Sequence, residues 1–384
     1  MSVTTKEATG KVVKNEKSKA AKQKSVFAEF DPLKQKRLTI LDHTGKIIAP
    51  EWMPDISDEL LIEGYKTMKF ARMADNKCVN YQRQGKMFTL PVNRGQEAVV
   101  GTTMAINRDD WACQAFREMA ALLFHGVPIE RMFMQNMGLE EGAVYDDVNA
   151  TPMSVPIASQ MQHACGIGHA IKYRGGKEVV VAYVGDGGTS TGDFHESLNW
   201  AAVFKCPVIF IINNNQYAIS AHRDVQTMTP TLAQKAIAYQ MPGIQVDGND
   251  MLAVYRATSE AVEHARAGNG PSLIELLTYR MGAHTTSDDP SKYRDKKEET
   301  YWEARDPLAR VKIYLESRKL WNDKLEKAHE EYVNRKIEAA FVMASAMGPN
   351  TVVELFSHQF AEMTNSLQDQ MADLQAYLLW KEEH

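Results

Sequence analysis

Strand-like segments rich in apolar residues recur through the middle of the chain. Residues 179–184 form a continuous apolar run rich in Val, residues 207–212 form the next buried strand, and strand-like segments follow at 243–246 and 273–277. An uninterrupted run of this kind is typical of a strand that is buried on both faces of a parallel sheet. Residues 193–204 and 252–267, which lie between these runs, have the length of helices. Strand and helix therefore alternate, which predicts an α/β fold with a doubly wound parallel sheet.

Apolar residues at helical spacing mark both ends of the chain. From Ile56 to Tyr81 they predict one long helix, and Ser57 or Asp58 supplies its N-cap. After residue 290 the chain changes to charged helices, in which Asp323 and Glu326 are spaced as a capping box. The apolar stripe that follows ends at residues 348–349 and consists of Leu325, Tyr332, Val333, Ile337, Ala340 and Phe341. We expect this stripe to be core or subunit interface.

These patterns divide the chain into four parts. They are a tail (1–25), an N-terminal helical region packed on the catalytic domain (26–110), an α/β core (111–300) and a C-terminal helical extension (301–384). The tail is rich in Lys, Ala, Thr and Ser and lacks the apolar centre of a signal peptide. We expect it to be disordered, because it cannot bury enough surface to offset its ordering entropy.

Charge and composition exclude several classes of function. A net charge of −5 over 384 residues gives no sign of the basic surface that nucleic-acid binding requires. No apolar run approaches the roughly 20 residues of a membrane span. The four cysteines are scattered without metal-site spacing, which indicates reduced, buried thiols in a reducing compartment and favours the cytoplasm.

Candidate chemistry lies where two neighbouring strands end. The first strand opens into Gly185-Asp186-Gly187-Gly188, and the next ends at residues 213–215, all asparagine. Ligands of an open parallel sheet sit beyond the carboxyl ends of its strands, so both motifs should share one rim. Backbone amides at Gly187 and Gly188 can approach a phosphate closely, and the helix from about residue 193 points its positive end there.

A phosphate beside the Asp186 carboxylate requires a cation between them. Asp186, an Asn amide oxygen, a backbone carbonyl and phosphate oxygens form an all-oxygen shell, which suits Mg²⁺. A lone Gly-Asp-Gly is usually only a tight turn. The two motifs together, each at a strand end, point to a metal-diphosphate site.

Several motifs carry a resemblance to a known family. Gly185-Asp186-Gly187 followed at this interval by Asn214-Asn215 matches the thiamine diphosphate-binding signature. Over about residues 45–345 the chain resembles the α subunits of thiamine diphosphate-dependent 2-oxo acid dehydrogenases, in particular the bacterial pyruvate dehydrogenase branch. The matching segments are GQEA (95–98), FRE (116–118), GDGGTSTGDF (185–194), YAIS (217–220), TLAQKA (231–236), GIQVDG (243–248) and YRMGAHTTSDD (279–289).

The resemblance implies the thiamine diphosphate-binding fold, with thiamine diphosphate and Mg²⁺ as cofactors. It implies that Asp186, the Asn215 side chain and the Tyr217 carbonyl are the Mg²⁺ ligands. The implied cofactor-binding residues are Phe116, Arg117, Ile157, Gly185, Asp186, Gly187, Gly188, Asn215, Tyr217 and His284. Among them, Arg117 is expected to contact the diphosphate, whose oxygens suit a two-pronged cation.

Three further positions refine this picture. Ile157 matches the apolar wedge that bends the cofactor, within a segment (154–160) that also resembles a monovalent-cation loop. Phe116 stands where the family often has Tyr, so a hydroxyl contact is lost. Asn213 stands where some relatives have Arg or Glu, which removes a possible phosphate contact.

His284 is the catalytic candidate of this chain. On its own, a histidine on a polar loop would be an ordinary exposed residue, but the matching histidine of the family lies at the mouth of the site. Asp288, Asp289 and Arg294 are expected to brace this loop by charge pairing, although exposed pairs contribute little.

The resemblance also implies partners. Thiamine chemistry needs a carboxylate that activates the aminopyrimidine ring, and in this family it sits on a separate β subunit. We therefore expect an α₂β₂ heterotetramer that decarboxylates pyruvate and acetylates the lipoyl group of an acyltransferase core. Two alternatives stay open: an α subunit acting on branched-chain 2-oxo acids or acetoin, and a non-catalytic phosphate-binding regulatory protein on the same fold. Residues 231–248 favour the pyruvate branch.

Overall fold

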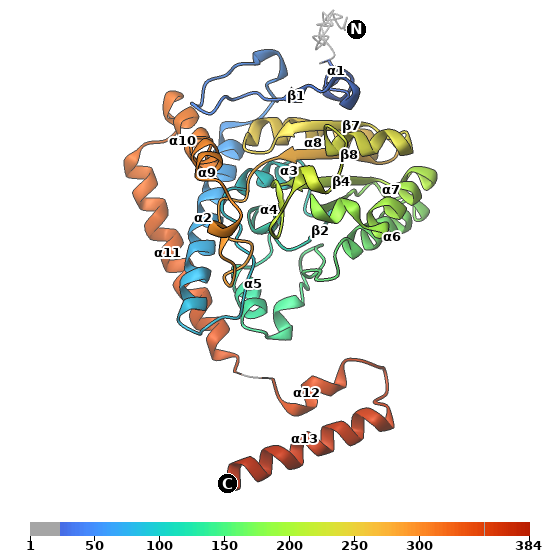
Figure 1. Cartoon of the computed structure of the whole chain (residues 1–384), viewed down its shortest axis with the longest axis vertical. Helices are drawn as coiled ribbons and strands as arrows, with labels where there is room; N and C mark the ends of the chain where they lie inside the picture. The colour runs from blue at the N-terminus through green and yellow to red at the C-terminus, as the bar shows by residue number, and fades with distance from the viewer. Residues whose placement is uncertain (1–23, 349) are drawn as a thin grey trace, which may run out of the picture.

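A six-stranded parallel sheet forms the centre of the molecule (Figure 1). The computed structural model describes residues 24–348 and 350–384. The strand order is β1-β7-β8-β4-β3-β2. The strands are β1 (Arg37–Leu38), β2 (Trp111–Cys113), β3 (Val180–Gly185), β4 (Val208–Asn214), β7 (Gly243–Asp247) and β8 (Ser272–Leu277). A separate antiparallel pair consists of β5 (Tyr217–Ala218) and β6 (Ala221–His222). The predicted α/β fold with a parallel sheet is confirmed.

Helices cover both faces of the sheet because alternate strand residues point to opposite sides. Val181 and Ile209 pack in one apolar cluster with α2 (Asp58–Arg83), α3 (Val100–Met104) and α8 (Met251–Arg266). Val180 and Phe210 pack in a second cluster, on the other face, with α6 (Ser159–Tyr173) and α7 (Gly192–Phe204). Burial of both faces is why these strands are apolar throughout.

The remaining elements surround this core. The other α-helices are α1 (Val26–Glu29), α4 (Met119–His125), α5 (Ile129–Asn136), α9 (Lys296–Glu303), α10 (Pro307–Ser317), α11 (Asp323–Ala346), α12 (Val352–Ser357) and α13 (Asn365–Glu383). The 3₁₀ helices are η1 (Pro32–Lys34), η2 (Pro50–Trp52), η3 (Glu97–Val99), η4 (Glu140–Ala143), η5 (Gly187–Ser190), η6 (Arg223–Val225), η7 (Leu232–Tyr239) and η8 (Pro290–Lys292).

The N-terminal region differs from the helical region that we predicted. It contributes the edge strand β1, which pairs in parallel with β7. Strands as short as β1 and β2 contain too few residues to show a hydrophobic period, so the sequence pattern does not reveal them. Of the predicted tail, residues 1–23 lie outside the described part of the chain. Ser25 caps α1 through the amide of Ala28.

Two caps test the helix predictions. Ser57 caps α2 by accepting from the Leu60 amide at 3.2 Å, as one of our two alternatives had it. The predicted capping box of Asp323 and Glu326 is wrong. Asn322 caps α11 instead, by accepting from the Leu325 amide.

Glu326 is unavailable to a capping box because tertiary partners engage its carboxylate. The hydroxyl of Tyr65, the indole of Trp321 and the ammonium of Lys69 all donate to it. The apolar stripe of α11 is core in its middle, where Val333, Ile337 and Ala340 are buried. Its ends differ, since Leu325 and Tyr332 are exposed, whereas Phe341 stacks on Tyr81.

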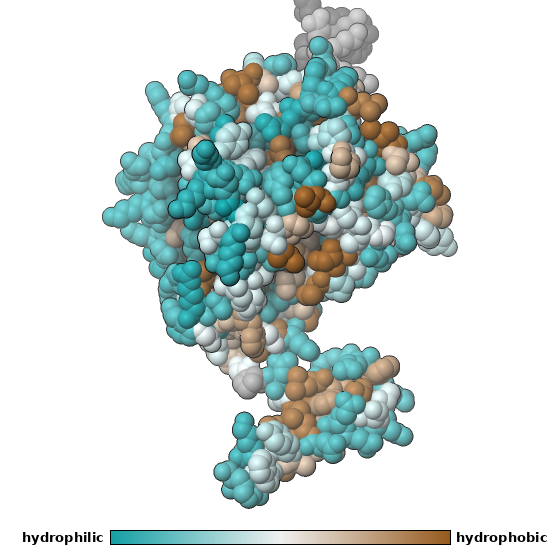
Figure 2. Space-filling model, in the orientation of Figure 1, coloured by the Kyte–Doolittle hydropathy of each residue, from teal (hydrophilic) through white to brown (hydrophobic). Residues whose placement is uncertain are grey.

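Helices α12 and α13 form a hairpin that extends from the body of the molecule (Figure 1). Exposed apolar side chains gather on this hairpin (Figure 2); they include Val353, Leu355, Phe360, Leu379 and Trp380. No helix of the described residues is long and apolar enough to cross a membrane. The four cysteines are free and buried, as predicted.

Candidate active site

The two predicted motifs share one rim of the sheet because β3 and β4 are neighbours. Gly185 pairs with Asn213 across them, so Asp186 and Asn215 follow within two residues of this pair, at the same edge of the sheet. Beyond Asp186 the chain turns at once into η5, where the Thr189 amide donates to the Asp186 carbonyl at 3.1 Å. Helix α7 then starts at Gly192, directly after η5, and the Thr191 side chain caps it by accepting from the Phe194 amide.

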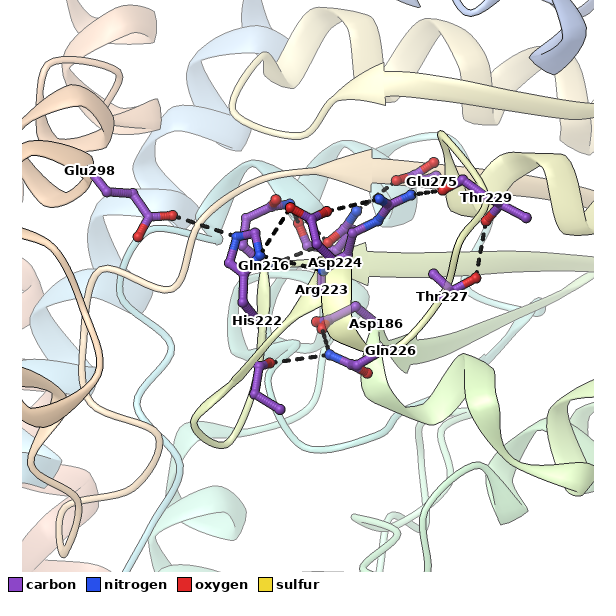
Figure 3. A network of polar contacts seen from close by, with 12 residues as sticks. Asp186, Gln216, His222, Arg223, Asp224, Gln226, Thr227, Thr229, Glu275 and Glu298 are labelled. Atoms are coloured by element: carbon purple, nitrogen blue, oxygen red, sulfur yellow. Dashed lines mark hydrogen bonds and ion pairs between the residues drawn. The ribbon is translucent and has the colours of Figure 1, made fainter.

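Asp186 belongs to a polar network, in which its side chain is bonded to Gln226 (Figure 3). Its side chain is buried, and Oδ2 accepts a hydrogen bond from the Gln226 amide at 3.0 Å. Burial raises the pKa of Asp186, while Gln226 and the backbone amide of Asn215 favour its charged form. A buried carboxylate is a group that a bound cation would stabilise.

The other implied ligands lie on the loop after β4. The Asn215 side chain donates from Nδ2 to Gln96 at 3.0 Å, and its Oδ1 faces the Tyr217 amide at 3.3 Å. This arrangement defines which end of the Asn215 amide is oxygen. The Tyr217 carbonyl accepts from Arg280 at 3.1 Å, and a carbonyl retains a second lone pair for a metal.

The residues at this rim fit an Mg²⁺-diphosphate group. In the described part of the chain, no three His, Cys, Asp or Glu side chains gather in a group that could hold a metal. A cation here would therefore have one carboxylate, Asp186, together with neutral oxygens such as those of Asn215 and Tyr217. Such a shell leaves positions for phosphate oxygens, as Mg²⁺ sites commonly do.

Two glycines of the motif are required by packing. A Cβ on Gly187 would lie 2.5 Å from the Ala218 Cβ, and one on Gly188 would lie 2.5 Å from a methyl group of Val184. A Cβ on Gly185, by contrast, would meet no atom within 4 Å. The close approach of Ala218, on the loop after β4, therefore explains Gly187, and the Val184 side chain of β3 explains Gly188, even without a phosphate.

The segment before α6 lies against the same turn. A methyl group of Ile157 would be 3.2 Å from a Cβ on Gly188, and the Ile157 side chain is 47% exposed, which leaves it accessible to a ligand. Ala158 adopts a left-handed conformation with φ of 70°. The Ser154 and Ser159 hydroxyls lie 2.6 Å apart, and both donate to the Pro156 carbonyl.

Arg117 is buried and hydrogen-bonded to protein atoms. Its guanidinium donates to the carbonyls of Val92 and His284 and to His284 Nδ1 at 2.9 Å. Burial and then the nearby Arg280 lower the pKa of Arg117 to about 9. The Phe116 ring lies 5.3 Å from the Arg117 guanidinium carbon. A guanidinium has five N–H donors, so Arg117 could contact a diphosphate without losing these three bonds.

Glu118 explains why Asn213 stands where some relatives of the family have Arg or Glu. The buried Glu118 carboxylate accepts from the amides of Ala115 and Arg117 and from the Asn213 side chain at 2.9 Å. Burial raises the pKa of Glu118 to about 7. Asn213 therefore serves this buried acid rather than a phosphate.

His284 lies between two guanidinium groups. Arg117 and Arg280 donate to its Nδ1 at 2.9 and 3.3 Å, and since arginine only donates, Nδ1 carries no proton. Burial first, then these two cations, lower the pKa of His284 to about 4. The imidazole is thus neutral, with its hydrogen on Nε2.

The loop around His284 is braced, but the expected charge pairing is wrong. Asp288 accepts from the His284 amide at 2.7 Å and from the Tyr293 hydroxyl. Asp289 instead bonds to Ser291 within the loop. Arg294 donates to the Gly282 carbonyl at 2.6 Å and lies 3.7 Å from Glu299 rather than pairing with either aspartate.

Sequence reasoning missed three residues that orient this site. Gln226 bonds to Asp186, Gln96 to Asn215, and Arg280 to Tyr217 and His284. Gln96 and Arg280 stand inside motifs that we recognised, so their position there was an available signal. Gln226 lies 40 residues from Asp186 and had no comparable signal.

Known proteins match nearly the whole chain. Residues 65–352 match the family described as dehydrogenase E1 component. The chain is 43% identical over 341 residues to the pyruvate dehydrogenase E1 component subunit alpha of Acholeplasma laidlawii, which covers 88% of this chain and 99% of that protein. It is 39% identical over 367 residues to the protein of the same name from Staphylococcus aureus, covering 93% and 98%. Both the family match and these identities span the rim that holds Asp186. The chain therefore belongs to the dehydrogenase E1 component family.

Proposed function

We propose that this chain is the α subunit of a pyruvate dehydrogenase (acetyl-transferring) and binds the Mg²⁺-diphosphate half of thiamine diphosphate. One observation supports this most directly: Asp186 follows β3, and Asn215 and Tyr217 follow β4, so three oxygen atoms that could bind Mg²⁺ lie at the same edge of the sheet. The names of relatives at 39–43% identity support pyruvate as the substrate.

Each residue has a defined task in this proposal. Asp186, the Asn215 amide oxygen and the Tyr217 carbonyl would hold Mg²⁺, and phosphate oxygens would complete its shell. Arg117 and Arg280 supply positive potential beside the diphosphate. Thiamine diphosphate, when bound, supplies the nucleophilic carbon and the electron sink for decarboxylation of a 2-oxo acid.

His284 would act as a neutral hydrogen-bond donor at the mouth of the site. Its Nδ1 accepts from Arg117 and Arg280, so the hydrogen on Nε2 is the one available to substrate. Asp288 holds the backbone amide of His284 and so orients the loop. Ile157, which is exposed beside Gly188, would support the cofactor through its apolar side chain.

The proposal includes partners and a compartment. A β subunit would supply the carboxylate that activates the cofactor, in an α₂β₂ heterotetramer, and the acetyl group would pass to a lipoyl-bearing acyltransferase core. The four buried free cysteines are in keeping with work in the cytoplasm.

Steady-state kinetics of the reconstituted enzyme test this function. The chain is co-purified with its β subunit, and kcat/KM is measured for pyruvate, 2-oxoisovalerate and acetoin with a lipoyl domain as acceptor. We expect pyruvate to be preferred by about tenfold or more, the scale on which a pocket discriminates added methyl groups. A preference for 2-oxoisovalerate or acetoin would reassign the substrate, and no turnover of all three would favour a regulatory protein.

A further inference from the structure

Gln226 stands immediately after η6 and makes the single side-chain hydrogen bond to Asp186 that the structure shows among its described residues. Its Nε2 donates both hydrogens, one to Asp186 Oδ2 at 3.0 Å and one to the Ala221 carbonyl at 3.3 Å (Figure 3). A reversed amide would place its oxygen against two other oxygens, so this orientation is the stable one.

The bond to Gln226 engages only one of the two Asp186 oxygens. A carboxylate rotates about its Cβ–Cγ bond, and each rotation presents a different oxygen to a neighbouring cation. A donor on Oδ2 opposes this rotation and leaves Oδ1 for a metal. Outer partners of this kind commonly orient metal-binding carboxylates.

Gln226 lies in a loop that is held by several hydrogen bonds (Figure 3). The Arg223 amide donates to the Gln216 carbonyl at 2.9 Å, and the Arg223 guanidinium donates to the Thr229 carbonyl. The Gln226 amide donates to the Arg223 carbonyl at 3.0 Å and closes the turn. The side chain of Gln216 bonds back to Asn214 Oδ1 at 2.8 Å, at the end of β4.

These bonds hold residues 214–229, at the end of β4 and in the loop after it, together. That segment carries two of the implied metal ligands, Asn215 and Tyr217, whereas Asp186 comes from the end of β3. The Gln226 side chain therefore links Asp186, which follows β3, to the loop after β4, which carries Asn215 and Tyr217.

We propose that Gln226 is a positioning residue for the metal: it sets the rotation of the Asp186 carboxylate and holds Asp186 in register with Asn215 and Tyr217. This inference rests on the proposed function, because it takes Asp186 as a ligand of Mg²⁺. Gln226 acts through Asp186 and touches neither substrate nor cofactor.

The test is metal affinity in Gln226→Met, which keeps the side-chain length and removes the donor. Free Mn²⁺ is measured by electron paramagnetic resonance at saturating thiamine diphosphate, with the complex co-purified with its β subunit. We expect the Mn²⁺ dissociation constant to rise by about tenfold. The thermal midpoint of the metal-free complex should stay near that of the wild type, which a merely structural role of Gln226 would not allow.

Two further variants sharpen the result. Val225→Ala changes a 77% exposed neighbour in the same turn and should leave Mn²⁺ affinity unchanged. In the Asp186→Ala background, Gln226→Met should add no further loss of Mn²⁺ affinity, since it acts through that carboxylate.

The outcomes separate the inference from the proposed function. If Asp186→Ala weakens Mn²⁺ binding but Gln226→Met leaves it unchanged, the positioning role is wrong and the metal site stands. Tighter binding in Gln226→Met would show that Gln226 blocks the metal position, which also overturns the inference. Wild-type Mn²⁺ affinity in Asp186→Ala would overturn both.

Discussion

At the scale of single residues, the site depends on one buried carboxylate and two buried guanidinium groups. In the proposed function, Asp186 supplies negative charge for a cation, while Arg117 and Arg280 supply positive charge for phosphate and substrate. Burial disfavours the charged form of each group, and it therefore raises the pKa of Asp186 and lowers the pKa values of Arg117 and His284. The consequences can be measured one residue at a time.

Asp186→Ala should weaken thiamine diphosphate binding by at least tenfold, about 1.4 kcal/mol. The physical reason is that the substitution removes the charged protein ligand of the metal and leaves the diphosphate with arginine and backbone partners. Quenching of intrinsic fluorescence by thiamine diphosphate, titrated in the presence of Mg²⁺, measures this. Asp193→Ala, at the start of α7, is the matched control and should bind normally. Unchanged affinity in Asp186→Ala would refute the metal assignment.

Arg117→Gln should raise the pKa of His284 from about 4 toward its ordinary value of 6.5. The substitution removes a cation beside the ring while the burial of the ring remains. Nuclear magnetic resonance of ¹³C-labelled histidine reports the titration, and His284→Gln identifies the resonance. If the His284 pKa stayed the same in Arg117→Gln, the guanidinium would not be the cause of the shift.

The sign of the linked stability follows from the same pKa values. Between about pH 4 and 6.5 the unfolded chain binds a proton at His284 and the folded chain does not. The contribution of His284 to folding stability therefore rises with pH through this window and is complete above it. In Arg117→Gln that rise should be smaller, because the two pKa values lie closer together.

At the scale of elements, Asp250 joins parts of the fold that are far apart in the sequence. Its Oδ1 caps α8 by accepting from the amides of Leu252 and Ala253. Its Oδ2 accepts from the amides of Ile40 and Leu41 at 2.6 and 2.7 Å, just beyond the edge strand β1. A carboxylate can accept all four bonds because it has no hydrogen to place among them.

Asp250→Asn should therefore destabilise the protein by about 3 kcal/mol, since an amide loses acceptors and presents N–H groups to buried N–H groups. Urea unfolding followed by circular dichroism gives the difference. Asn322→Ala removes an exposed cap of α11 and serves as the control, with a loss of about 1 kcal/mol. A loss for Asp250→Asn no larger than that of the control would mean that Asp250 acts only as a helix cap.

At the scale of the whole molecule, the proposed function makes this chain one side of an active site. The buried acids nearest to Arg117 are Glu118 and Asp75, and both already accept hydrogen bonds from protein amides. Glu118 uses both of its oxygens in hydrogen bonds, whereas Oδ2 of the buried Asp75 has no hydrogen-bond partner among the described residues. In the proposed function, the activating carboxylate comes from the β subunit. The extended α12–α13 hairpin also exposes apolar side chains to solvent (Figure 2).

The chain purified alone should thus decarboxylate no pyruvate, and activity should appear on titration with the β subunit. Release of CO₂ from pyruvate, measured against the concentration of complex found by analytical ultracentrifugation, tests this. A catalytically inactive β variant that still assembles is the control. Robust turnover by the isolated chain would mean that an activating acid lies within it.

The sequence by itself determined the parallel sheet, its principal strands and the edge of the sheet at which the candidate site lies. Strands such as β3 and β4 are apolar throughout because both faces are buried, and Asp186 and Asn215 follow them directly. These features are local, or depend on the end of a strand, so pattern and spacing are enough to predict them.

Only the tertiary structure decided which groups meet across long separations. The two-residue strand β1, the partners of Glu326 and the cap at Asn322 depend on which segments pack together. The same holds for Gln226 beside Asp186 and for Arg280 beside His284. Hydrogen bonds between distant segments produce no periodic pattern in the sequence. Their geometry arises only when the sheet has formed and the loops after its strands lie at the same edge.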